Sequence, residues 1–180
     1  MKTRILAIFL GLPAAACSSP PPPTASAAAV RPAATTPAPA PALAARPLGE
    51  WIDWPIAAGD WVYRKDERGS IALFGIPGKD ALLTLRCDTA RQRVYLARAD
   101  VAAQRGGTLT VRSSSARKDF AAKSTGAPLP YLAVEIMPTD PILDAIVYTR
   151  GRFAVEATGQ SSVAIPSWSE IARVVEDCRV

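Results

Sequence analysis

The chain has no histidine among its 180 residues, and this absence removes much of the chemistry an enzyme would use. Histidine is the usual general base near neutral pH and the commonest metal ligand. Ser-His-Asp and Cys-His nucleophilic sites and the HExxH zinc site are therefore excluded. No glycine-rich loop ends in Lys-Ser or Lys-Thr, as a phosphate-binding P-loop requires. We predict a protein that is not an enzyme and holds no cofactor or metal ion.

Three short matches to catalytic motifs have simpler structural interpretations. The S-x-x-K spacing of penicillin-binding enzymes occurs at Ser115 to Lys118, but the Lys-Ser-Thr-Gly run at residues 123–126 follows too soon to be the matching strand. The Asp-Thr-Ala run at residues 88–90 lacks the glycine of aspartic proteases and is typical of a hairpin turn. Asp140 and Asp144 could share the face of a short helix, yet an aspartate directly before Pro141 is better explained as the cap of that helix.

The first 17 residues have the three parts of a bacterial signal peptide. Lys2 and Arg4 form a basic start, residues 5–12 form an apolar core, and three alanines at 14–16 form a small-residue cleavage site. The apolar core is too short to span a membrane permanently. We expect residues 1–17 to direct export.

Cys17 follows the small residues directly, and there the segment resembles the lipobox of bacterial lipoproteins. In that family the cysteine is lipidated and becomes the first residue of the mature protein. Ser18, not aspartate, follows it, which by the same resemblance favours an outer-membrane anchor with the domain facing the periplasm. Simple secretion after the alanines is the alternative, because they also satisfy the A-x-A rule.

Residues 18–47 change abruptly to proline, alanine, serine and threonine, with four consecutive prolines at 20–23. Such a segment has too few large apolar side chains to build a core and favours an extended polyproline conformation. At about 3 Å per residue it would reach roughly 90 Å. We interpret it as a disordered tether, and residues 48–180 as one domain of ordinary size.

Two cysteines remain once Cys17 is assigned to lipidation. In an oxidising compartment the simplest pairing is a disulfide between Cys87 and Cys178, with free buried thiols as the alternative. The bond would fix the last helix of the domain to the sheet.

Short segments with alternating apolar and polar residues recur through the domain, separated by glycine- and proline-containing turns. The expected strands are 60–64, 71–74, 81–87, 92–98, 108–112, 118–122, 131–137, 152–157 and 162–165. Their spacing favours a mainly β fold, an antiparallel β-sandwich or a partly open barrel.

Two short helices are expected near the end of the domain. Asp140 should cap the first, with Pro141 at its first position and a buried face formed by residues 142, 143 and 146. Ser167 and Glu170 should form a capping box at the start of the second. The buried face of this C-terminal helix should comprise Trp168, Ile171, Val175 and Cys178.

The net charge of +5 is mild, since 21 basic side chains oppose 16 acidic ones, and it does not argue for nucleic acid as a partner. Basic residues concentrate between Arg86 and Lys123. Arg91 and Arg93 should share a strand face, and with three further arginines could contact anionic lipid headgroups or envelope polymers. The further arginines are Arg98, Arg105 and Arg112. The alternative is an ordinary solvated sheet face.

Several short motifs suggest a family. They are Gly59-Asp60-Trp61, Arg86-Cys87-Asp88, Asp144-Ala145-Ile146, Arg150-Gly151-Arg152-Phe153 and Glu176-Asp177-Cys178-Arg179. Together they resemble those of uncharacterised bacterial envelope lipoproteins and, more loosely, of the invasion-associated locus B proteins. The likeness to locus B proteins implies a secreted β-rich domain without a known catalytic site. From the sequence as a whole we expect a lipid-anchored, non-catalytic binding or structural module whose partner is an unidentified envelope protein or polymer.

A second resemblance is to the membrane-bound inhibitors of c-type lysozyme, which are small all-β lipoproteins. Their inhibitory loops contain Ser-Gly-x-x-Tyr and a later Trp-x-Lys-Gly. The nearest matches here are Ser115 to Lys118 and Tyr148-Thr149-Arg150-Gly151, in which an arginine replaces the lysine. An anchored or secreted inhibitor of a host cell-wall hydrolase is therefore the alternative function.

Overall fold

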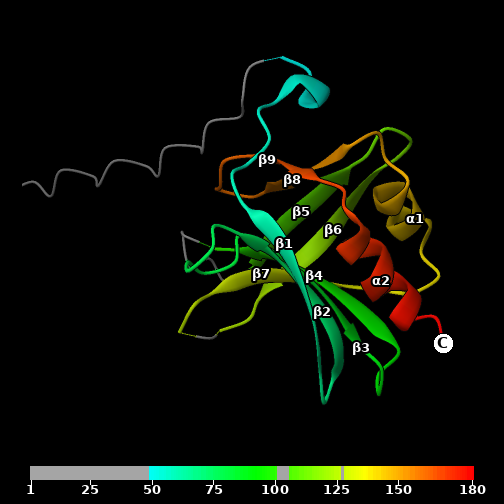
Figure 1. Cartoon of the computed structure of the whole chain (residues 1–180). Helices are drawn as coiled ribbons and strands as arrows, with labels where there is room; N and C mark the ends of the chain where they lie inside the picture. Colours follow the sequence, from blue (N-terminus) through cyan, green and yellow to red (C-terminus); the bar gives the residue numbers. More distant parts are fainter. Residues whose placement is uncertain (1–48, 101–105, 127) are drawn as a thin grey trace, which may run out of the picture. The chain divides into compact units, whose positions relative to one another are not determined.

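A computed structural model describes residues 49–100, 106–126 and 128–180 of the chain. The strands in these residues form one antiparallel sheet that curls into a half-barrel (Figure 1). Their bounds are β1 Asp60–Asp66, β2 Gly69–Gly75, β3 Leu83–Asp88, β4 Arg93–Ala99, β5 Gly106–Arg112, β6 Arg117–Ser124, β7 Tyr131–Ile136, β8 Arg152–Ala157 and β9 Val163–Pro166. This confirms the mainly β prediction in its barrel form.

The strand order is β1-β2-β3-β4-β7-β6-β5-β8-β9. Strands β1 to β4 pair in chain order, and the expected β3–β4 hairpin is present. The next three strands fold back, so that β7 pairs with β4 while β5 pairs with β8. Strands β4 and β7 thereby become neighbours although β5 and β6 lie between them in the sequence. Inside the sheet, β6 and β7 meet at a junction.

The two ends of the sheet approach each other. Ile56 bridges Ala164 of β9 in a parallel sense, and Trp61 of β1 donates its indole N–H to the carbonyl of Pro166 at 2.8 Å. Gly59 permits this path, since a Cβ there would lie 2.6 Å from the backbone carbonyl carbon of Gly75. The segment before β1 thus narrows the opening of the half-barrel. It carries a short 3-10 helix, η1 (Trp51–Asp53).

Helix α1 (Pro141–Val147) begins as the sequence predicts. The Asp140 carboxylate accepts a hydrogen bond from the amide of Ile142 at 3.1 Å, and Pro141 occupies the first helical position. Residues 142, 143 and 146 are buried, which confirms the predicted apolar face.

Helix α2 (Ser169–Asp177) packs against β1, β2 and β3 and touches α1. The predicted capping box is wrong. The Ser167 hydroxyl donates instead to the carbonyl of Ile146 at 2.8 Å, so it satisfies the last turn of α1, and α2 starts one residue later. Trp168 is consequently 45% exposed, and Val174 completes the buried face.

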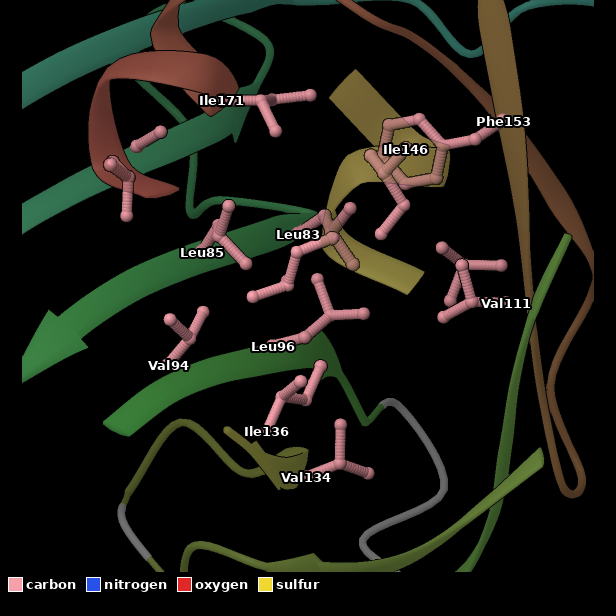
Figure 2. Close-up of a cluster of buried hydrophobic side chains, with 14 of the residues drawn as sticks. Leu83, Leu85, Val94, Leu96, Val111, Val134, Ile136, Ile146, Phe153 and Ile171 are labelled. Carbon is pink, nitrogen blue, oxygen red and sulfur yellow. The ribbon is translucent and has the colours of Figure 1, made fainter. Parts of the chain in front are cut away.

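The core lies between the concave face of the sheet and the two helices. Figure 2 shows side chains from both layers converging: Ile146 of α1, Ile171 of α2 and Phe153 of β8 face a layer of leucines, valines and isoleucines. All of these are almost fully buried. One apolar interior therefore connects strands from both ends of the sheet.

The predicted disulfide is confirmed. Cys87 at the end of β3 is bonded to Cys178, which follows α2, with the two Cα atoms 5.4 Å apart. The bond ties the C-terminal helix to the sheet and spans 91 residues of sequence.

Candidate functional site

The junction between β6 and β7 is the weakest pairing inside the sheet. Only Lys123 with Ala133 and Ser124 with Leu132 are in register. By contrast, β6 pairs with β5 over seven residues and β7 pairs with β4 over six. The two strands therefore meet at one end and separate along the rest of their length.

The main-chain hydrogen bonds show which backbone groups point into the gap between β6 and β7. The amide of Thr125 donates to the carbonyl of Tyr131 at 2.9 Å, so these two residues point across the junction. Main-chain groups along a strand bond alternately to its two sides. Ala121 of β6 and Glu135 of β7 therefore face each other across the gap, and in the described residues neither has a strand residue paired on that side.

A groove of about 330 Å³ lies at this junction. It is lined by Tyr95, Ala121, Lys123, Ser124, Thr125, Ala133, Val134 and Glu135. The alanines leave space that larger residues on an outer sheet face would fill. Val134 is 3% exposed and belongs to the core, yet it is one of the residues that line the groove. The groove therefore extends from the outer face of the sheet toward the interior.

Of the two charged side chains that line the groove, Glu135 is in an ion pair and Lys123 is in none among the described residues. The Glu135 carboxylate accepts a hydrogen bond from the guanidinium of Arg93 at 2.7 Å and is thereby neutralised. Lys123 is exposed, and no ion pair joins it to any residue in the described part of the chain. The hydroxyls of Ser124 and Thr125 accept from nearby main-chain amides. The groove thus presents one ammonium group that no carboxylate balances.

The structure does not gather the predicted arginines into one patch. Arg91 lies in the turn before β4 rather than on the strand, and its guanidinium lies 3.2 Å from the Asp88 carboxylate. Arg93 pairs with Glu135 beside the groove, whereas Arg112 pairs with Glu156 on β8. Each has a carboxylate partner, which reduces its attraction for a distant anion.

Arg98 is placed in the interior, which corrects its expected position on the surface. It is 5% exposed because alternate residues of β4, Val94 and Leu96 among them, point inward with it. Its guanidinium donates to the carbonyl of Leu82 at 3.1 Å, and burial lowers the pKa of this arginine. Arg105 lies outside the described residues.

The Asp-Thr-Ala run lies at the predicted hairpin turn: Asp88 is the last residue of β3, and the turn to β4 follows it. The Asp88 carboxylate accepts from the guanidinium of Arg68 at 2.9 Å and from the amide of Arg91 at 3.1 Å. The bond from Arg68 is the main reason that the pKa of Asp88 lies below its usual value. Its hydrogen bonds give Asp88 a structural role in joining the β1–β2 and β3–β4 turns.

The two segments that resemble lysozyme-inhibitor loops lie side by side. The amide of Ser114, in the β5–β6 turn, donates to the hydroxyl of Thr149 at 3.0 Å, and the amide of Arg150 donates to the hydroxyl of Ser114 at 3.3 Å. Arg150 is exposed, and Tyr148 beside it is 81% exposed. The carboxylate pair suggested by sequence is divided between two contacts, since Asp140 caps α1 and Asp144 binds Arg179.

The predicted signal peptide, the lipidated Cys17 and the tether fall within residues 1–48, outside the described residues. Among the helices of the described segments, none is long and apolar enough to cross a bilayer. No group of three carboxylate or cysteine side chains that would suit a metal ion occurs in residues 49–100, 106–126 or 128–180.

Neither a protein-family model, a curated protein nor a solved structure matches this chain. Sequence reasoning did not find the groove. Its one sequence signal is the pair of small residues at Ala121 and Ala133, and these have meaning only once the strand order places them on opposite sides of a junction.

Proposed function

We propose that this protein is a non-catalytic lipoprotein of the bacterial outer membrane, anchored through Cys17, whose β-rich domain binds an envelope protein or polymer in the groove between β6 and β7. The observation that carries the binding proposal is the incomplete strand pairing beside a groove of about 330 Å³. A cavity of this size suits a small ligand or a short segment of a larger one.

Three features support the location in the envelope. The N-terminal segment has the composition of a lipoprotein signal peptide and a proline-rich tether follows it. The Cys87–Cys178 disulfide suits an oxidising compartment such as the periplasm. The resemblance to envelope lipoproteins and to locus B proteins points in the same direction.

The anchor is tested by isolating envelopes from the native host and comparing the wild type with Cys17→Ser by mass spectrometry. We expect acylation of Cys17 in the wild type, and release of the Cys17→Ser variant from the membrane fraction. A wild-type chain that keeps residues 1–16, or one that is soluble and lacks acylation, would show that the anchor is wrong.

The groove is tested by crosslinking in the same envelopes followed by capture through the domain. Ala121→Trp places a large side chain in the groove, and Ala90→Trp places the same side chain on an exposed turn as a matched control. We expect a specific crosslinked partner with the wild type and with Ala90→Trp, and its loss with Ala121→Trp. Equal capture by all three proteins would place the binding surface elsewhere.

A second candidate function is inhibition of a host c-type lysozyme. The observation that favours it is the contact between the β5–β6 turn and the Thr149–Arg150 loop, which presents an exposed arginine. Such lysozymes cleave with two carboxylates, to which a cation would be attracted. We expect an inhibitor to block lysozyme at equimolar concentration and to weaken with Arg150→Ala but not with Arg64→Ala. Full lysozyme activity in a molar excess of the protein would rule this function out.

A further inference from the structure

We infer that the groove between β6 and β7 takes an extended, acidic peptide segment of an envelope protein, which adds as a β-strand along the open strand edges. The inference rests on the proposed function and specifies the chemistry of its partner.

The main chain of β6 and β7 favours an extended peptide as the occupant of the groove. Ala121 and Glu135 direct their amide and carbonyl groups into the junction, where the register of β6 and β7 has already ended. Main-chain donors and acceptors need hydrogen-bond partners, and an open strand edge is a template for another strand. An extended peptide supplies amides and carbonyls at the spacing such an edge requires. A glycan strand has no such regular alternation, which favours a peptide over a polysaccharide.

The side chains that line the groove favour an acidic occupant. Successive residues of an added strand point to opposite faces, so every second side chain would lie over the groove. There it would meet the small apolar surface of Ala121 and Ala133, the ring of Tyr95 and the ammonium of Lys123. Because Arg93 already neutralises Glu135, Lys123 gives the groove a net positive charge. A carboxylate on the added strand would balance it.

The predicted tether of this chain does not suit the groove as its occupant. Residues 18–47 contain no aspartate or glutamate and have repeated prolines, which lack the amide needed for a ladder bond. The predicted tether therefore lacks the negative charge that would balance Lys123, although its proline-free stretch at residues 24–31 keeps its main-chain amides. The acidic strand must come from a partner.

The probe for this inference is an acetylated and amidated octapeptide of alternating threonine and valine with one central glutamate. Two companion peptides replace the glutamate with glutamine or lysine. A third carries N-methyl groups on alternate residues, so that the main-chain amides along one of its edges cannot donate hydrogen bonds to a neighbouring strand. Binding to the full chain in detergent is measured by fluorescence anisotropy. We expect the glutamate peptide to bind about tenfold more tightly than the lysine peptide, and the peptide methylated on its bonding edge not to bind.

Matched charge variants locate the effect. Lys123→Glu should reverse the preference, so that the lysine peptide binds better than the glutamate peptide. Lys79→Glu changes an exposed lysine in the β2–β3 turn, outside the groove, and should leave the preference unchanged. Because Lys123→Glu adds little bulk, it keeps the test decisive if Ala121→Trp fails to fold.

The outcomes separate this inference from the proposed function. Equal binding of the methylated and unmethylated peptides would overturn strand addition, and equal binding of the glutamate and lysine peptides would overturn the acidic specificity. If no peptide binds although Ala121→Trp abolishes capture of the envelope partner, the peptide inference is wrong and the groove still binds another class of molecule, such as a polymer. If Ala121→Trp leaves capture unchanged, the groove itself is the wrong site.

Discussion

The main chain of the sheet is fully paired around β3 and only partly paired at the β6–β7 junction. Strand β3 pairs with six residues on each side, is covered by α2, and is bonded to the end of that helix through Cys87. Strands β6 and β7 share two register pairs, and no residue of α1 or α2 lines the groove beside them. Both regions belong to one continuous sheet, yet they differ in how completely their main chain is paired.

The difference indicates that the region around β3 stabilises the fold, whereas the β6–β7 junction is available for binding. A domain of this size has only a small net stability, so a few strong constraints decide whether it folds. Here those constraints connect β1, β2 and β3 with the C-terminal helix. The junction can stay incompletely paired because other parts of the sheet provide the stability, and this leaves strand edges available to a ligand.

The largest effect should come from removing the disulfide with Cys87→Ser and Cys178→Ser together. The bond closes a loop of 91 residues, and on the chain-entropy model its loss costs about 4 to 5 kcal/mol of the free energy of unfolding. Urea unfolding measures the change, with Cys17→Ser as the control for losing a cysteine outside the domain. A double variant as stable as the wild type would mean that helix packing alone holds this region.

A smaller loss is expected from Ile171→Ala on the buried face of α2. Ile171 is 1% exposed, and truncating such a side chain costs about 2 to 5 kcal/mol. Ile52→Ala removes the same atoms from a side chain that is 40% exposed and should change the free energy of unfolding by less than about 0.5 kcal/mol. Similar losses for the two variants would show that α2 is not a principal constraint.

Much of this scaffold could be predicted from sequence because its signals are local. Alternating apolar residues placed the strands, and an aspartate before a proline placed the start of α1. The disulfide followed from counting the cysteines of a chain that its first residues predict to be exported. Each of these inferences needs only neighbouring residues or a simple pairing rule.

The errors arose where a distant contact competed with a local one. Ser167 has a good local partner in Glu170, but its hydroxyl binds the end of α1 instead. Arg98 differs from Arg93 by an odd number of positions, so strand alternation already places it on the opposite face. The groove depends on β7 pairing with β4 rather than with the whole of β6, a choice of strand order that no local pattern specifies.

The contact between α2 and β1 should add a modest, pH-dependent contribution. The Tyr63 hydroxyl donates to the Asp177 carboxylate at 2.5 Å, and the Lys65 ammonium lies 3.6 Å from the other carboxylate oxygen. Burial raises the pKa of Asp177, but the hydrogen bond from Tyr63 and the charge of Lys65 help to bring the net value below the usual one.

A carboxylate whose pKa is lower in the folded than in the unfolded state stabilises the fold above the unfolded pKa, about 3.9 for aspartate, and loses that effect as the pH falls through the folded value. We therefore expect Asp177→Asn to reduce the free energy of unfolding at pH 7, and its difference from the wild type to shrink as the pH falls through the folded pKa of Asp177. Urea titrations at several pH values measure this difference. A constant difference across the range would assign the loss to packing rather than to charge.

The smallest effect on stability should come from Lys123→Glu, although it reverses the charge of the groove. Lys123 is exposed and joins no ion pair in the described residues, so its substitution removes no stabilising contact. Changes at such positions alter the free energy of unfolding by less than about 0.5 kcal/mol. Urea unfolding of this variant measures its stability, and the peptide-binding measurements on the same variant test its charge preference. A loss above about 1 kcal/mol would make Lys123 part of the scaffold, and the contrast between a stabilising region and a binding region would no longer hold at this residue.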